Sequence, residues 1–240
     1  MYRGLRVIAI APVLDERRKI ANVIDRVPQD VVDEILIVDD GSVDGSPEVS
    51  RERGAAVIEL GRTIGVGAAI RRGYEYAVEN GFDVAVVMAG NNKDSPEEIP
   101  LLLDPIAEGD ADLVQGSRWI DGGTDFGDMP VYRRIATKVH PAIFRLISSA
   151  KLTDTTNGFR AARTDLLADE NLALDQRWLD EYELEVYLLF KAAKLGYRVT
   201  EVGVTKRYPP KALGQTKMKP IVGWWSILRP LLLLGSGIKK

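Results

Sequence analysis

The chain has 240 residues and a formal net charge of −3 at pH 7, and 45% of its residues are hydrophobic and 28% are charged. These values are typical of one soluble α/β domain with a sizeable core, and they exclude a general electrostatic attraction to nucleic acid. The sequence contains no cysteine, which excludes disulfides and thiolate metal sites and agrees with a reducing compartment.

The first half alternates between short apolar runs and amphipathic segments with helical spacing. The first amphipathic segment, 16–27, has Asp15 before it as a candidate helix N-cap. We expect strands over 7–11, 35–38, 56–60, 84–88 and 113–115, and helices over 16–27, 46–53, 67–79 and 96–108. The alternation predicts an α/β fold with a mostly parallel, Rossmann-like central sheet and helices on both faces.

The second half is less regular. A glycine pair at 122–123 indicates a loop that extends to 129. We expect helices over 131–149 and 180–195, and strands over 157–162 and 197–205, the first of which returns to the sheet. Since no repeat or low-complexity linker is visible, we expect one domain over 1–217 and a helical appendage over 218–240.

The C-terminal segment 221–238 is mostly apolar, but Arg229 and Pro230 interrupt it. The run is marginal against the ~20 residues that a membrane-spanning helix needs. Trp224, Trp225 and flanking lysines favour an interface, so the segment either docks on the domain, lies on a membrane surface or forms a homodimer. No signal peptide precedes the first strand, so we expect a cytoplasmic protein, peripheral on the cytosolic membrane face if the appendage binds there.

Two carboxylates, Asp39 and Asp40, directly follow the second expected strand and precede a glycine-rich turn. In open α/β sheets ligands bind at the carboxyl ends of strands, and ionised side chains are costly there unless they are used. Because carboxylates only accept hydrogen bonds, they suit sugar hydroxyls and base N–H groups. The alternative is a solvated turn with a helix N-cap at Asp44 or Ser46.

Further motifs follow the same chain order. Residues 65–73 (GVGAAIRRG) form a Gly-x-Gly turn that opens a helix and offers N–H groups to an anion. The other motifs are APVLDE at 11–16, DDGS at 39–42 with Asp44, QGSR at 115–118, TDTTNGFR at 153–160 and GQTK at 214–217. Together they resemble family 2 glycosyltransferases of the GT-A fold, and most of all the dolichol- and polyprenyl-phosphate sugar synthases, from about Val7 to Met218.

The resemblance implies an inverting glycosyltransferase that takes a sugar from a UDP- or GDP-sugar to a polyprenyl or dolichyl phosphate. It implies nucleotide or donor contacts for Pro12, Val13, Asp15, Glu16, Asp39, Asp40, Ser42, Gly65, Gly67, Arg71, Ala89, Gly90 and Asn91. We expect catalytic roles for Lys93, Arg118, Arg160, Asp180 and Glu181, and acceptor-phosphate contacts for Arg133, Arg134, Lys211 and Lys217. For Asp180 and Glu181, helix capping is the alternative.

The family's metal-binding Asp-x-Asp motif is altered, because Ala89 and Asn91 stand at its two acidic positions. Mg²⁺ and Mn²⁺ prefer oxygen ligands that include carboxylate. Three alternatives stay open: weaker metal binding through Asn91, Asp94 or Asp40; replacement of the metal by Lys93 and nearby arginines; or a protein that binds nucleotide sugar without turnover. A sugar nucleotidyltransferase is a further alternative, but those enzymes usually carry a glycine-rich loop where this chain has APVLDE.

Overall fold

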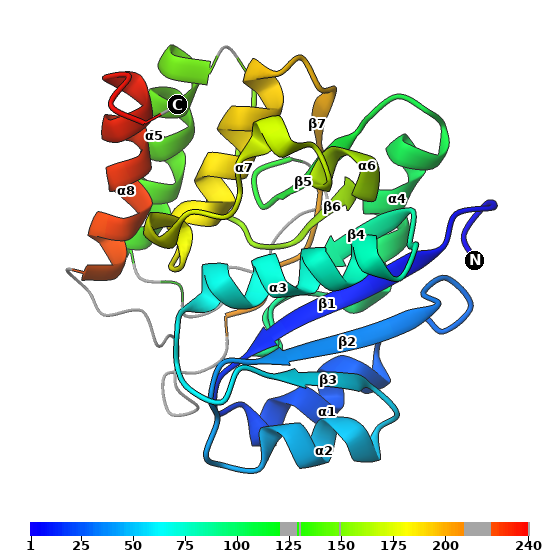
Figure 1. The fold of residues 1–240 in the computed structure, drawn as a ribbon. Helices are drawn as coiled ribbons and strands as arrows, with labels where there is room; N and C mark the ends of the chain where they lie inside the picture. The colour runs from blue at the N-terminus through cyan, green and yellow to red at the C-terminus, as the bar shows by residue number, and fades with distance from the viewer. Residues whose placement is uncertain (121–128, 130, 149, 209–221, 240) are drawn as a thin grey trace.

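The computed structural model describes residues 1–120, 129, 131–148, 150–208 and 222–239. It contains a seven-stranded sheet with the order β3-β2-β1-β4-β6-β5-β7 (Figure 1). The strands are β1 (Val7–Val13), β2 (Glu34–Asp39), β3 (Ala56–Glu59), β4 (Val84–Val87), β5 (Leu113–Ser117), β6 (Arg160–Arg163) and β7 (Val199–Gly203). β6 is antiparallel to its neighbours β4 and β5, and the other pairs are parallel, so the predicted mostly parallel α/β sheet is confirmed.

The helices cover both faces of the sheet. They are α1 (Arg17–Asp25), α2 (Ser46–Glu52), α3 (Val66–Glu79), α4 (Ile99–Ala107), α5 (Val131–Ser148), α6 (Thr164–Leu167), α7 (Glu183–Lys194) and α8 (Val222–Gly235), with 3₁₀ turns at Pro96–Glu98, Glu170–Leu172 and Arg177–Leu179. One core cluster joins the sheet to α3, α6, α7 and α8, and the other joins it to α1 and α4. Apolar side chains therefore lie on both faces of β1 and β4, as in a buried parallel sheet.

The starts of β6 and α7 lie three residues later than the sequence predicts. β6 begins at Arg160 rather than at 157, because Asn157 turns its side-chain amide to the carbonyl of Gly116 instead of pairing as a strand residue. α7 begins at Glu183 rather than at 180, because residues 180–182 form a turn against the start of α3, where the Ala68 N–H donates to the carbonyl of Asp180 at 3.0 Å. Both differences come from contacts between segments far apart in the chain.

The C-terminal helix α8 packs against α5 and α7, and α5 and α8 lie side by side at one edge of the molecule (Figure 1). Ile227, Leu231 and Leu234 are its buried side. His140 of α5 donates from Nε2 to the carbonyl of Ile227 at 3.2 Å and accepts at Nδ1 from Thr155 at 2.6 Å. Within the described residues, no helix combines the length and the apolar character needed to cross a bilayer. The predicted boundary at 217 and 218 lies outside the described residues.

Candidate active site

The site lies at the carboxyl ends of β1, β2 and β4. The chain runs from β1 to β2 and β3 on one side of β1 and then crosses over to β4 on the other side, so the strand order reverses at β1. Open α/β sheets bind ligands at such a topological switch point. Three of the predicted donor segments, 12–16, 39–44 and 89–91, lie at or just beyond the ends of these strands. The sheet therefore brings together residues that are separated by up to 79 positions in the chain.

The loops after β1 and β2 are tied together by side chains. The N–H of Asp15 donates to Ser42 Oγ at 2.8 Å, and Asp15 Oδ1 accepts from the N–H of Val43 at 2.9 Å. The N–H of Glu16 likewise donates to Ser46 Oγ at 2.9 Å. Asp15 does not cap α1, as the sequence analysis expects, because Glu16 takes the N-cap position and Asp15 adopts a positive φ of 47°. The two loops thus form one wall of the site.

Asp39 presents an unsatisfied oxygen to this site. The residue is 2% exposed, and its Oδ2 accepts from the N–H groups of Gly41 at 3.1 Å and Ser42 at 2.9 Å. Its Oδ1 is buried and has no hydrogen-bond partner among the described residues. A buried carboxylate oxygen without a donor is costly, so an N–H or O–H group of a ligand would stabilise it.

Asp40 points to the turn that leads into α3. Its Oδ1 accepts from the N–H of Ile64 at 2.7 Å, and both oxygens lie within 3.2 Å of the N–H of Gly65. Burial raises the pKa of Asp40, and these N–H groups oppose that shift. The Gly-x-Gly turn, which the sequence suggests as an anion site, already has an acidic side chain of the protein beside it.

The glycines of this turn allow a close backbone contact with residues 179–181. A Cβ at position 67 would lie 2.0 Å from the carbonyl oxygen of Leu179 and 2.4 Å from that of Glu181. Arg71, one turn further along α3, pairs with Asp180 at 2.6 Å. The structure therefore gives Gly65, Gly67, Arg71 and Asp180 partners within the chain, and their predicted donor and catalytic roles stay predictions. Glu181 lies beside Gly65, because a Cβ there would be 3.1 Å from its carboxyl carbon.

The segment after β4 carries the altered Asp-x-Asp motif. Gly90 packs on the end of β1, since a Cβ there would be 2.6 Å from Val13 and 3.0 Å from the carbonyl of Pro12. Asp94, which is 3% exposed, accepts from the N–H of Ala89 at 2.8 Å and pairs with Lys206 at 2.6 Å. Asn91 Oδ1 is buried and lacks a partner among the described residues. Across all the residues that the structure describes, no group of three or more His, Cys, Asp or Glu side chains could hold a metal ion.

Arg118 forms a buried ion pair with Asp154. Their side chains are 2% and 0% exposed, and the pair is bidentate, with distances of 2.6 Å and 2.8 Å. Burial alone would raise the pKa of Asp154, but the guanidinium of Arg118 holds it below its usual range. Arg118 also donates to Tyr208 Oη at 2.8 Å. The predicted catalytic arginine is thus a fixed link between the segment after β5, residues 154–156 and the segment after β7.

Arg160 is also buried, at 1% exposure. Its Nη1 donates to the carbonyl of Glu185 and its Nη2 to the carbonyl of Asn157, each at 2.8 Å. These bonds connect β6 to α7. Its predicted catalytic role stays a prediction, and within the described residues its guanidinium links β6 to α7.

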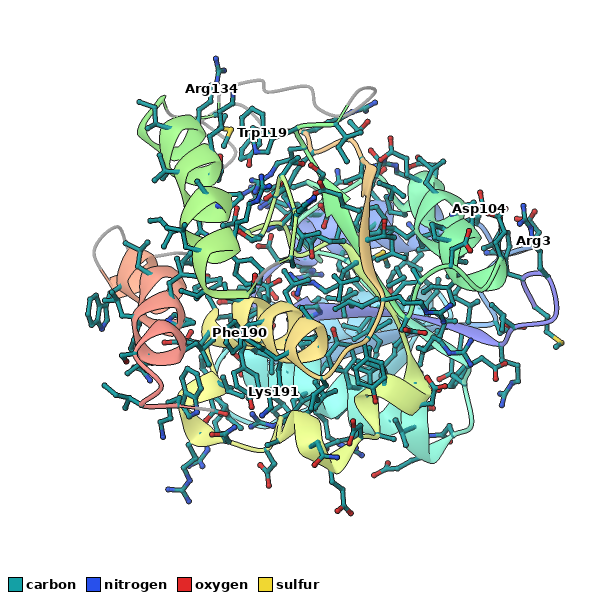
Figure 2. All side chains as sticks on the ribbon, turned by 90° about the horizontal axis from the view of Figure 1, so that it is seen from above. Arg3, Asp104, Trp119, Arg134, Phe190 and Lys191 are labelled. Carbon is teal, nitrogen blue, oxygen red and sulfur yellow. The ribbon has the colours of Figure 1, made fainter. Side chains whose placement is uncertain are left out.

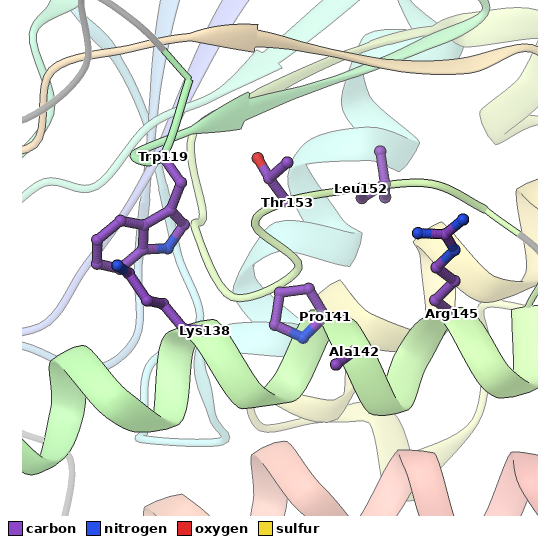
Figure 3. A pocket seen from close by; sticks show the side chains of 7 residues that line it. All are labelled: Trp119, Lys138, Pro141, Ala142, Arg145, Leu152 and Thr153. Atoms are coloured by element: carbon purple, nitrogen blue, oxygen red, sulfur yellow. The ribbon is translucent and has the colours of Figure 1, made fainter.

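The predicted acceptor cations lie on or beyond α5. Arg133 and Arg134 are in its first turn, and Arg134 is exposed on the same side of the molecule as Trp119 (Figure 2). Lys211 and Lys217 lie outside the described residues. A shallow pocket of about 390 Å³ lies further along α5, where the ammonium of Lys138 is 4.6 Å from the centre of the Trp119 ring (Figure 3).

Sequence reasoning misses Lys206, although a signal was available. Lys206 donates to both Asp94 Oδ1 at 2.6 Å and Asn157 Oδ1 at 2.7 Å, and so holds two site segments together. A lysine soon after the last strand of a parallel sheet lies at the ligand-binding edge. The sequence motif at 153–160 contains Asp154, but nothing in the sequence says that its partner is Arg118.

Comparison with known proteins agrees with this geometry. The model of the glycosyl transferase family 2 matches residues 9–169. The chain therefore belongs to glycosyl transferase family 2, and the predicted class of enzyme, a glycosyltransferase, is confirmed.

Individual relatives cover most of the chain. It is 34% identical over 221 residues to the undecaprenyl-phosphate mannosyltransferase of Micrococcus luteus, covering 89% of this chain and 88% of the relative. It is 32% identical to the polyprenol monophosphomannose synthase of Mycolicibacterium smegmatis, covering 89% and 81%. Glucosyl-3-phosphoglycerate synthase from Mycobacterium tuberculosis, solved with Mn²⁺, UDP and glucosyl-3-phosphoglycerate, has a TM-score of 0.70 at 20% identity, covering 99% and 82%. This last similarity supports the GT-A fold.

Proposed function

We propose that the protein is an inverting glycosyltransferase that moves a sugar from a UDP- or GDP-sugar to a polyprenyl phosphate. The observation that carries the proposal is the buried, unpartnered Oδ1 of Asp39 at the topological switch point. Uracil and guanine each have a ring N–H that such an oxygen can accept. The acceptor class is supported by the names of the two relatives, a mannosyltransferase acting on undecaprenyl phosphate and a polyprenol monophosphomannose synthase.

The reaction is a direct displacement. A phosphate oxygen of the acceptor forms a bond to the anomeric carbon, while the bond from that carbon to the donor diphosphate breaks. The electron pair leaves with the nucleoside diphosphate, and the configuration inverts. The acceptor's second pKa is about 6, as in other phosphomonoesters, so it is already anionic near neutral pH and needs no strong general base.

An assay with labelled UDP- and GDP-sugars and vesicles containing polyprenyl phosphate tests the proposal. We expect the label to enter a lipid-extractable product, with one nucleoside diphosphate released per sugar. Donor binding without lipid product would favour the non-catalytic alternative. Formation of nucleotide sugar from sugar 1-phosphate would favour the nucleotidyltransferase alternative.

A surface formed by α5 and α8 supports binding to a membrane. Exposed apolar side chains recur at helical spacing along both helices, and the most exposed, Leu146, is 85% accessible. The α5 members are Ile135, Val139, Ile143 and Leu146, and the α8 members are Trp225, Leu228 and Leu232. Neither helix contains an acidic residue, whereas α5 contains Arg133, Arg134, Lys138 and Arg145. An apolar face flanked only by positive charges is complementary to an anionic bilayer. We therefore propose that this α5–α8 surface binds an anionic membrane.

We expect the protein to float with vesicles that contain anionic phosphatidylglycerol and to bind far less to vesicles of neutral phosphatidylcholine. The double variant Leu146→Asp and Leu232→Asp is expected to lose about 10-fold or more in vesicle affinity, because two charges enter the apolar face. Leu101→Asp is the matched control, since Leu101 is an exposed leucine on α4, which packs on the opposite face of the sheet. A concentration-dependent dimer that the double variant breaks, without vesicle binding, would contradict the membrane proposal.

A further inference from the structure

The pocket beside α5 contains none of the residues that the sequence predicts for the donor, for catalysis or for the acceptor phosphate. Two cations of α5, Lys138 and Arg145, line it together with the indole ring of Trp119 (Figure 3). Both cations are exposed, and within the described residues no carboxylate forms an ion pair with either of them. The pocket therefore carries positive charge that the described part of the chain does not neutralise.

The wall opposite α5 is formed by the segment that contains Thr153 (Figure 3). The carboxylate of Glu201 contacts this wall, where it accepts from the N–H of Thr153 at 2.8 Å and from its hydroxyl at 3.0 Å. These donors stabilise the charged carboxylate in place. Glu201 thus serves the wall of the pocket and forms no bridge to Lys138 or Arg145.

The two cations border the apolar row of α5 that belongs to the α5–α8 surface. Lys138 directly precedes Val139 and Arg145 directly precedes Leu146, so each lies about 100° around the helix from a member of that row. Their own separation of seven residues is close to two turns, which places both on one side of α5. Because long basic side chains extend from an apolar contact towards the phosphate level of a bilayer, the pocket opens beside the proposed membrane contact at headgroup depth.

The side chains of the pocket suit a lipid phosphate. A guanidinium group can contact two phosphate oxygens at once, and an ammonium group adds a full charge with three N–H donors. The ammonium of Lys138 lies 4.6 Å from the centre of the Trp119 ring, a contact that holds the cation at the rim of the pocket. Tryptophan is itself enriched at the interface between bilayer and water. A headgroup with a net negative charge is therefore favoured, whereas the choline cation of a zwitterionic headgroup would be repelled.

We propose that this pocket binds the phosphate of one anionic phospholipid, with Lys138 and Arg145 as its counter-charges. The inference rests on the proposed function, which brings the α5–α8 surface to an anionic membrane. It adds a site for a lipid of the bilayer itself, separate from the phosphate of the acceptor. Such a site makes membrane binding depend on the chemistry of one headgroup as well as on the average charge of the surface.

The test is calorimetric titration of the full chain with dihexanoyl-phosphatidylglycerol, kept below the concentration at which it forms micelles so that no membrane surface is present. We expect one lipid to bind per chain, and dihexanoyl-phosphatidylcholine to bind at least about 10-fold more weakly. The double variant Lys138→Ala and Arg145→Ala should lose about 10-fold or more in affinity, because two charged contacts to the phosphate are removed. The matched control is Arg18→Ala with Lys194→Ala, which removes the same charge from exposed positions on α1 and α7.

Four outcomes would overturn the inference. The first is equal affinity of the wild type for the two lipids, which is decisive even where a variant does not fold. The second is an equal loss in the test and control variants, with both verified as folded by circular dichroism. The third is equal affinity for glycerol phosphate, which would assign the pocket to a soluble phosphate. The fourth is loss of transfer to detergent-solubilised polyprenyl phosphate with unchanged phosphatidylglycerol affinity, which would assign it to the acceptor.

The inference and the proposed function fail in different experiments. A protein that binds dihexanoyl-phosphatidylglycerol in the pocket but forms no glycosylated lipid would contradict the proposed function and leave the headgroup site in place. A protein that forms the glycosylated lipid but binds neither short-chain lipid would contradict the headgroup site and leave the glycosyltransferase intact.

Discussion

Replacement of Asp154 by alanine is expected to lower the free energy of unfolding by about 3–5 kcal/mol, because it leaves the guanidinium of Arg118 buried without its counter-charge. Both side chains are almost inaccessible, and the pair also holds Tyr208 through Arg118. Urea denaturation followed by circular dichroism measures the change. Because the pair joins three segments of the site, the loss should be cooperative and should not appear as local fraying.

A second ion pair provides the control for this experiment. Asp112 and Arg198 also form a bidentate contact, but the Arg198 side chain is 55% exposed. Asp112→Ala should therefore cost no more than about 1 kcal/mol, as for other surface pairs. Equal losses for the two variants would show that burial does not set the contribution of the Arg118–Asp154 pair.

Replacement of Asp39 by asparagine is expected to weaken nucleotide binding about 10- to 100-fold while the protein stays folded. The amide oxygen can still accept from the N–H groups of Gly41 and Ser42, as Oδ2 does now. The amide nitrogen then takes the place of Oδ1 and presents N–H groups where the ligand also offers one. Calorimetric titration with UDP and GDP measures the loss, and thermal unfolding verifies the fold.

Asp33→Asn is the matched control for Asp39. Asp33 precedes β2 and lies at the amino-terminal ends of β1 and β2, away from the carboxyl ends that form the site. There its Oδ2 accepts from the N–H of Val7 at 2.8 Å. Its replacement should leave nucleotide affinity unchanged. If Asp39→Asn destabilises the protein but its folded fraction binds nucleotide normally, Asp39 serves the loop and not the ligand.

The regular part of the fold is predictable because local pattern decides it. β1 and β4 are short apolar runs that are buried on both faces, and their positions follow directly from the sequence. The later start of α7 is not predictable in this way, because it depends on the contact of Asp180 with Ala68, 112 positions away in the chain. Tertiary contacts of this kind leave no local signal.

In the site, too, the local sequence predicts some features, whereas others depend on tertiary contacts. The motifs lead to the carboxyl ends of β2 and β4, on either side of β1, where Asp39 and Asn91 each have a buried oxygen without a partner among the described residues. A motif does not say whether the partner of a charged residue is a ligand or the chain itself. Arg118 and Arg160 are predicted catalytic residues, yet in the structure their guanidinium groups bind a buried carboxylate and backbone carbonyls.

The carboxylate of Asp40 at the entry to α3 has a consequence for the medium in which the enzyme works. Helix starts commonly trap inorganic phosphate or sulfate, which exchange with the solution. Here the N–H groups of Ile64 and Gly65 are held by an acidic group that is part of the chain and cannot dissociate. We therefore expect this wall of the proposed nucleotide site to keep its shape when buffer anions change, because these N–H groups are not available to dissolved phosphate.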